Sequence, residues 1–148
     1  MPHDELQIAD CEIISEDHCT MNPEEFKKRT NAFAVRVINL VDCLPSSRAT
    51  NAIANQLVCS GMSVGANYRA ACRAKSRADF ISKMGTGEEE SDETLYWMEL
   101  LVESKKVKIA VLADLMREAG EILAITFASI NTLRARRSNL QSVIRNPQ

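Results

Sequence analysis

The sequence has few of the residues that interrupt helices or build sheets. It contains 5 Gly and 4 Pro in 148 residues, and aromatic side chains make up only 5% of it. Alanine, leucine, isoleucine and methionine are plentiful, and 45% of the residues are hydrophobic. Because this composition favours packed helices over a sheet of β-branched and aromatic residues, we expect one all-α domain.

Long apolar runs are also absent. No stretch approaches the roughly 20 apolar residues that span a bilayer, and no basic start is followed by an apolar run near the N-terminus. We therefore expect a cytoplasmic protein that does not enter a membrane.

Histidine and paired cysteines are scarce. The five cysteines are odd in number and form no C-x-x-C pair, which argues against a disulfide framework. The only histidines, His3 and His18, match no zinc-ligand spacing with Cys11 and Cys19. Without a histidine in the body of the chain, neither a nucleophile with its base nor a di-iron Glu-x-x-His site can be assembled. The sequence therefore predicts no enzyme, no metal site and no cofactor.

Lysine and arginine are missing from the first 21 residues, which hold six acidic side chains. These are Asp4, Glu5, Asp10, Glu12, Glu16 and Asp17. We expect residues 1–21 to form an extended or poorly ordered acidic arm. Ile8, Ile13 and Ile14 are the residues that could dock this arm onto the body.

Capping residues mark the starts of three helices. Asn22 precedes a proline and two glutamates, which is typical of a helix N-terminus. Ser46 or Ser47 can cap a second helix, and Ser76 stands three residues before an aspartate at the start of a third.

The fourth helical segment, residues 107–137, is apolar over most of its circumference. A helix of this kind is buried on more than one side, and we expect the second side to face another copy of the chain. Because the loops are short, neighbouring helices should run antiparallel. The sequence thus predicts an up-down-up-down four-helix bundle over residues 22–137, followed by a tail at 138–148.

Two glycines interrupt the third helix. Gly85 and Gly87 stand directly before Glu88, Glu89 and Glu90. Each glycine in a helix interior costs about 1 kcal/mol relative to alanine. We expect close packing of the third helix against the second to offset this cost.

An ordered set of short motifs runs through the bundle. Its members are Leu44-Pro45, Gln56, Ser63, Asn67, the segment SRADF at 76–80, and Glu93. Over about residues 26–127 the chain resembles the four helix bundle protein family, also described as the 23S ribosomal RNA intervening-sequence protein family. More distantly it resembles the accessory protein of diversity-generating retroelements. The resemblance implies a homopentameric barrel, an association with RNA or reverse-transcriptase systems, and no established catalytic activity.

The chain departs from the pattern of that family on two neighbouring helices, and the changes have opposite charge. Arg69 stands where the family usually has alanine, and Glu89 and Glu90 stand where it usually has Gly-Ser. These changes predict an inter-helix polar network that would fix the register of the second and third helices. Its members are Asn67, Arg69, Arg73, Glu89, Glu90 and Glu93. The alternative is that residues 88–93 form a solvated acidic face beside Lys83.

Basic residues also gather around the turn between the second and third helices. The candidate nucleic-acid patch consists of Arg69, Arg73, Lys75, Arg77 and Lys83. Repetition of this patch around an oligomer would multiply its field. The sequence therefore predicts a non-enzymatic assembly or adaptor module that self-associates, with five copies implied by the resemblance. RNA or DNA binding through the patch is the alternative, and no protein partner follows from the sequence.

Overall fold

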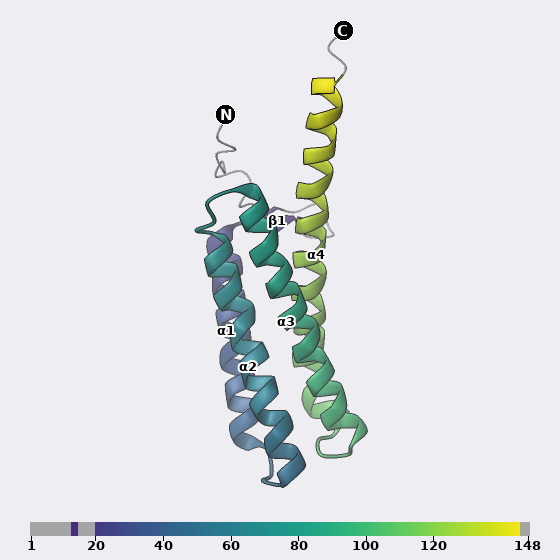
Figure 1. Ribbon diagram of the computed structural model, residues 1–148. Helices are drawn as coiled ribbons and strands as arrows, with labels where there is room; N and C mark the ends of the chain where they lie inside the picture. Colours follow the sequence, from purple (N-terminus) through teal and green to yellow (C-terminus); the bar gives the residue numbers. More distant parts are fainter. Residues whose placement is uncertain (1–12, 15–19, 146–148) are drawn as a thin grey trace.

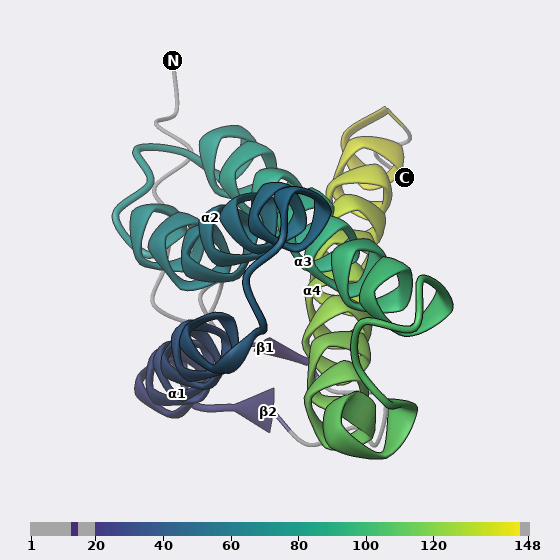
Figure 2. The same ribbon diagram turned by 90° about the horizontal axis from the view of Figure 1, so that it is seen from below.

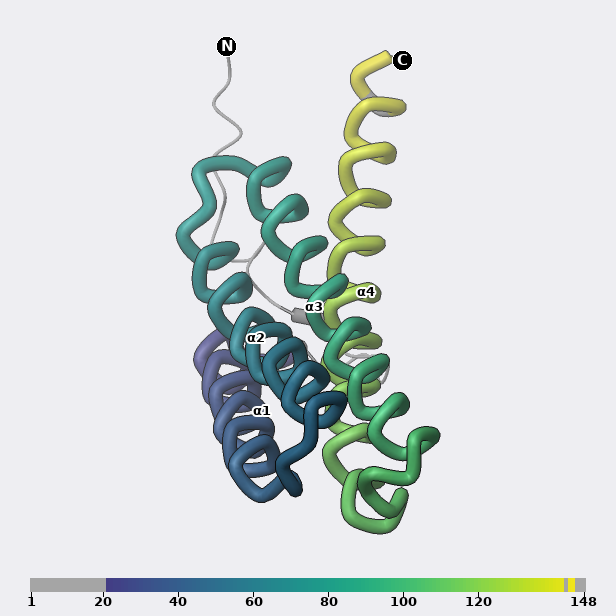
Figure 3. Tube along the Cα trace, turned by 60° about the horizontal axis from the view of Figure 1, so that its bottom comes forward, coloured from purple at the N-terminus to yellow at the C-terminus, as the bar shows by residue number. Residues whose placement is uncertain are grey.

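Four antiparallel helices make up most of the protein. The computed structural model describes residues 13–14 and 20–145. The helices are α1 (Pro23–Cys43), α2 (Arg48–Ala71), α3 (Arg77–Glu103) and α4 (Ile109–Arg145), which run up and down in chain order (Figure 1 and Figure 3). This confirms the predicted all-α, up-down-up-down four-helix bundle.

Two short strands precede the bundle. The strands β1 (Ile13–Ile14) and β2 (Thr20–Met21) pair antiparallel, and β1 contacts α4. Part of the predicted acidic arm therefore docks on the body of the protein. Residues 1–12 and 15–19 of the arm lie outside the described residues.

The predicted N-terminal caps are confirmed. The side chains of Asn22, Ser47 and Ser76 each accept a backbone N–H from two or three residues ahead, at 2.9, 3.1 and 3.1 Å. Each bond satisfies one of the N–H groups that a helix leaves unpaired at its start. At its other end α4 continues past Arg137, where it was predicted to stop, to Arg145, because no glycine or proline lies between them.

The turn between α3 and α4 begins with a C-terminal cap on α3. Lys105 has a φ of 57°, in the left-handed region. The N–H groups of Lys105 and Lys106 donate to the carbonyls of Val102 and Leu101, both at 2.9 Å. This bonding is the Schellman motif, which ends a helix and reverses the chain, so that α4 can pack antiparallel to α3.

The bundle is least closed between its first and last helices. Helix α2 packs against α1 and α3, and α3 packs against α4, whereas α1 and α4 pack little against each other. Figure 2 shows these two helices apart, with β1 and β2 between them. The largest buried side chains of the core include Phe26, Phe33, Leu57, Phe80, Met84, Met98, Leu101 and Ile122.

Two glycines of α2 allow it to approach α1 closely. A Cβ placed on Gly61 would lie 2.8 Å from Cγ1 of Val37, and one placed on Gly65 would lie 3.2 Å from Oγ1 of Thr30. Atoms do not tolerate the first distance, so the contact between α1 and α2 depends on glycine at position 61.

The packing predicted for Gly85 and Gly87 is found only at Gly87. Gly87 is buried, and a Cβ placed there would meet Cβ of Asn67 on α2 at an ordinary 3.7 Å. A Cβ placed on Gly85 would have no neighbour within 4 Å. The prediction is therefore wrong for Gly85, which points away from α2.

Neither a membrane span nor a metal cluster occurs in the part of the chain that the structure describes. None of its helices is long and apolar enough to cross a bilayer. No group of three or more His, Cys, Asp or Glu side chains among these residues could hold a metal ion. The four residues weighed as metal ligands in the sequence, His3, Cys11, His18 and Cys19, lie outside the described residues.

Candidate functional site

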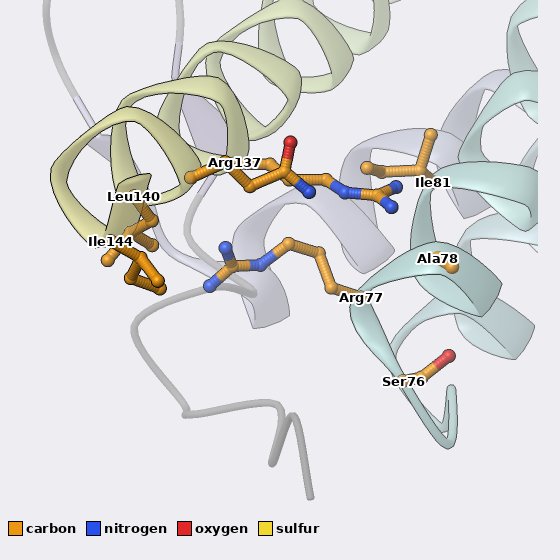
Figure 4. A pocket seen from close by; sticks show the side chains of 8 residues that line it. Ser76, Arg77, Ala78, Ile81, Arg137, Leu140 and Ile144 are labelled. Carbon is orange, nitrogen blue, oxygen red and sulfur yellow. The ribbon is translucent and has the colours of Figure 1, made fainter. Parts of the chain in front are cut away.

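A groove opens between the first turns of α3 and the last turns of α4. It has a volume of about 410 Å³ (Figure 4). A second hollow that shares Ile81 and Arg137 with it lies alongside. The groove is lined by Ser76, Arg77, Ala78, Ile81, Arg137, Leu140, Gln141 and Ile144. Its walls thus combine apolar side chains, guanidinium groups and uncharged polar groups. We call this feature the basic groove.

The basic groove exists because α4 extends past the helices beside it (Figure 1). Leu133 is buried, but Leu140 and Ile144, which continue the same helical stripe, are 55% and 75% exposed. Because α3 begins only at Arg77, it has no further turn that could cover them.

Two arginines enter the groove from opposite walls. Figure 4 shows Arg77 pointing from α3 toward α4, and Arg137 pointing from α4 toward Ile81. Arg134 adds a third guanidinium group to the adjoining hollow. No Asp or Glu is among the described residues that line the groove or this hollow. The groove therefore places guanidinium groups beside apolar surface.

The fold assembles only part of the predicted nucleic-acid patch. Arg77 lines the basic groove, and Arg73 and Lys75 are exposed in the α2–α3 loop at the same end of the bundle. Arg69 is exposed in the last turn of α2. Three of the five predicted residues thus lie in or beside the groove.

The basic patch in the structure differs from the predicted one, because Lys83 is paired with an aspartate and α4 adds two arginines. The Nζ of Lys83 lies 2.7 Å from Oδ2 of Asp79, so the charge of this lysine is compensated within its own helix. In contrast, Arg134 and Arg137, which the predicted patch did not include, line the groove and its adjoining hollow. The sequence contains no Asp or Glu from Ile122 onward, and this is the signal that could have identified them.

The basic side of the predicted inter-helix network does not reach α3. Arg69 and Arg73 are exposed, and neither forms an ion pair with a carboxylate among the described residues. The side-chain amide of Asn67 donates to the carbonyl of Ser63 in its own helix, at 2.8 Å.

The acidic side of the network stays on the surface of α3. Glu89 is exposed, and Glu93 accepts a hydrogen bond from Nε1 of Trp97 at 3.0 Å. Partial burial raises the pKa of the Glu90 carboxyl, and the nearby carboxylates of Glu93 and Glu89 raise it further. A guanidinium group paired with Glu90 would lower this pKa instead. The predicted network is therefore wrong, and the alternative of a largely solvated acidic face describes α3 better.

The interface between α2 and α3 explains this correction. Its centre consists of small residues, among which Oγ1 of Thr94 and Oγ of Ser60 lie 2.9 Å apart and are buried. Gly87 and Ser91 are also buried there, and the Ser91 hydroxyl donates to the Gly87 carbonyl. Helices that approach this closely leave no volume for an arginine side chain between them.

The charged contact that does connect two helices was missed by sequence reasoning. Arg29 of α1 lies against Glu118 and Glu121 of α4. Hydrogen bonding to Glu118, followed by that to Glu121, raises the pKa of Arg29, and the bond from Arg29 lowers the pKa of Glu118. Two neighbouring helices that pack little against each other are thus joined by an ion-pair cluster.

The fold and the groove together define a class of protein, an antiparallel four-helix bundle with a basic groove at one end. Residues 24–128 match the family model described as 23S rRNA-intervening sequence protein. Because this match covers well over half of the sequence, the chain belongs to the 23S rRNA-intervening sequence protein family, which confirms the resemblance seen in the sequence.

A solved structure supports the same assignment. A crystal structure from Bacteroides thetaiotaomicron is described as a protein of unknown function from the S23 ribosomal protein family. It is 33% identical to this chain with a TM-score of 0.70, and the match covers 75% of this chain and 99% of that one. No curated protein matches the sequence.

Proposed function

We propose that the protein is a non-enzymatic, self-associating helical module that serves assembly or acts as an adaptor. The observation that supports this most directly is a stripe of apolar residues on the outside of α4. Ile109 and Phe127 are each 54% exposed, and Met116 and Leu123 are half-buried between them.

The spacing of this stripe suits a second helix. Ile109, Met116 and Leu123 recur every seven residues, as in helices that pack side by side. A Cβ placed on Gly120 would have no neighbour within 4 Å, so the chain itself leaves this part of α4 uncovered. Burying large apolar side chains stabilises association by about 25 cal/mol for each Å² removed from water.

The surroundings of the stripe are polar. Glu88, Glu89 and Asp92 of α3 line a hollow together with Leu123 and Phe127. An apolar centre with a charged rim is the usual composition of a protein interface. The resemblance to the family implies five copies, and this number is part of the proposal.

Light-scattering mass of the purified protein tests the proposal. We expect an oligomer at micromolar concentration, and we expect Phe127→Glu to shift it toward a single chain without loss of helical circular dichroism. Tyr96→Glu on α3 is the matched control, because Tyr96 is a similarly exposed aromatic residue, at 50%. A well-folded single chain for the unaltered protein would contradict the proposal.

RNA or DNA binding in the basic groove is a second candidate function. It is favoured by Arg134 and Arg137, which line the groove and its adjoining hollow with no acidic residue among the described lining. Guanidinium groups bind phosphate oxygens through paired hydrogen bonds. Arg73 and Lys75 in the neighbouring loop would extend the contact along a nucleic-acid backbone.

A gel-shift assay at two salt concentrations tests this candidate. Affinity should fall steeply as salt rises, because each phosphate contact releases condensed cations. Arg134→Gln with Arg137→Gln should weaken binding and reduce the salt dependence, whereas Arg48→Gln with Arg117→Gln should not. The control pair removes the same charge from exposed residues remote from the groove. Equal weakening by both pairs would contradict a site in the groove.

A further inference from the structure

The outer face of α2 carries a regular row of exposed residues. They recur at alternating spacings of three and four residues, which keeps them on one side of the helix. Helix α2 contains no Asp or Glu, and Met62 in the middle of the row is 44% exposed. We call this row the α2 seam, and it consists of Ala52, Asn55, Cys59, Met62, Ala66 and Arg69.

The apolar stripe of α4 has the same repeat once its small residues are included. Its positions recur at alternating spacings of four and three residues, and all of them are exposed or half-buried. Helices with this repeat pack side by side through interlocking side chains. The α4 stripe consists of Ile109, Ala113, Met116, Gly120, Leu123 and Phe127.

The bundle holds the α2 seam and the α4 stripe level with each other along its axis. Helices α2 and α4 run in the same direction and pack on either side of α3 (Figure 1 and Figure 2). Asn67 of α2 faces Gly87 of α3, and the next residue of α3, Glu88, lines a hollow with Leu123 of α4. Ala66 is therefore level with Leu123 to within about one helical turn.

We propose that the α2 seam of one copy packs against the α4 stripe of the next copy. This inference rests on the proposed self-association and names the two surfaces of its interface. Contact between two different surfaces is head-to-tail, and it closes into a ring when the copies are related by rotation alone. Rotation about an axis along the bundle keeps helices parallel and residues level, so the seam of each copy meets the stripe of its neighbour.

The sizes of the side chains fix the register of this contact. With Ala66 opposite Leu123, each large residue of one helix meets a small residue of the other, as close helix packing requires. A shift by one turn would set Met62 against Met116 or Leu123 instead. The pairs in the proposed register are Ala52 with Ile109, Cys59 with Met116, Ala66 with Leu123, and Met62 with Gly120.

The charges at one end of the contact are complementary. In this register Arg69 lies beside Phe127 of the next copy, which lines a hollow of about 360 Å³ with Glu88, Glu89 and Asp92. Neither Arg69 nor these carboxylates form an ion pair within the described part of the chain. A guanidinium group is attracted both to carboxylates and to the face of an aromatic ring.

Disulfide trapping through the native Cys59, which is exposed, tests the interface. In a chain whose other four cysteines are replaced by serine, Met116→Cys should give covalent products longer than two chains under mild oxidation. One cysteine per chain can link only two copies, so Cys59 alone should give no product longer than a dimer. Cys59 with Val111→Cys is the matched control. Val111 is 65% exposed on α4, but it faces away from the stripe, because two residues turn a helix by about 200°.

Light-scattering mass separates the failure of this inference from that of the function on which it rests. An oligomer that gives no product longer than two chains with Cys59 and Met116→Cys would overturn the interface and leave self-association in place. Equal ladders from the Val111→Cys control would also overturn it. Covalent dimers from Met116→Cys in a chain without Cys59 would assign the contact to two α4 helices, against the proposal. A well-folded single chain for the unaltered protein would contradict both.

An exchange of charges tests the position of Arg69. Arg69→Glu should weaken association about tenfold, and addition of Glu88→Arg should restore it, because the two charges are then opposite again. Lys28→Glu is the control, since it makes the same change of charge at an exposed position of α1. Equal weakening by Arg69→Glu and Lys28→Glu, or no recovery with Glu88→Arg, would overturn the proposed register.

Discussion

Arg29 of α1 holds Glu118 of α4 through two parallel hydrogen bonds. Its Nε donates to Oε1 at 2.7 Å and its Nη2 donates to Oε2 at 2.9 Å. Both side chains are about three-quarters buried, and Glu121 also accepts from Nη2. Since α1 and α4 pack little otherwise, this bidentate pair is their main specific polar contact among the described residues.

Removing the arginine should therefore destabilise the fold. We expect Arg29→Met to lower the free energy of unfolding by about 1 to 3 kcal/mol, because it leaves a partly buried carboxylate without its donor. Arg117→Met is the matched control, since its pair with Asp114 is largely exposed, and its effect should stay within about 0.5 kcal/mol. Denaturant unfolding of both variants measures the difference, and equal losses would contradict a special role for Arg29.

The stability supplied by this pair should depend on pH. The bond from Arg29 holds the pKa of Glu118 below its usual value. A carboxyl with a lower pKa in the folded state adds stability above its unfolded pKa and loses it as the pH falls through the folded value. The difference between the parent protein and Arg29→Met should thus be full at pH 7 and shrink below about pH 4. A difference that stays constant down to pH 2 would contradict this origin.

Alanine should have opposite effects at two glycines. Gly61→Ala should destabilise the protein by about 1 to 3 kcal/mol, because the new methyl group would lie 2.8 Å from Val37. Gly85→Ala should stabilise it by about 0.5 to 1 kcal/mol, because the position is helical and has no neighbour within 4 Å. Thermal unfolding distinguishes the two variants. A Gly61→Ala variant more stable than the parent protein would contradict the prediction, because it would show that α1 can move away from the added methyl group.

Glycine should be favourable at the turn before α4. Lys105 adopts a positive φ, which strains any residue with a Cβ, so Lys105→Gly should stabilise the protein by about 0.5 to 1 kcal/mol. Lys106→Gly is the control, because its φ is not positive and the change should be neutral or destabilising. Chemical denaturation compares the two variants. Stabilisation by both would point to lost charge repulsion in place of relieved strain.

Local features of the fold could be predicted from the sequence, whereas contacts between distant residues could not. The caps at Asn22, Ser47 and Ser76 depend on residues two or three positions apart. Arg29 and Glu118 are separated by 89 positions, and no local pattern connects them. The direction of Arg69 depends on the rotation of α2, and each residue turns a helix by about 100°, so a small error moves a side chain to another face.

The basic groove was predicted in part for the same reason. Arg77 and the loop before it were selected because basic residues are close together there in the sequence. Leu140, Gln141 and Ile144 line the groove only because α4 remains helical past the predicted end at residue 137 and places its last turns beside α3.

The extension of α4 also has a consequence for the dynamics of the chain. A helical turn without tertiary contacts has little stability in water, because its few hydrogen bonds do not offset the conformational entropy lost when its backbone is ordered. The backbone amides around Leu140 should therefore exchange their hydrogens for deuterium much faster than those around Leu133, which the core protects. A molecule or segment that binds in the groove should slow that exchange. The exchange rate of the last turns of α4 would therefore show whether the groove is occupied.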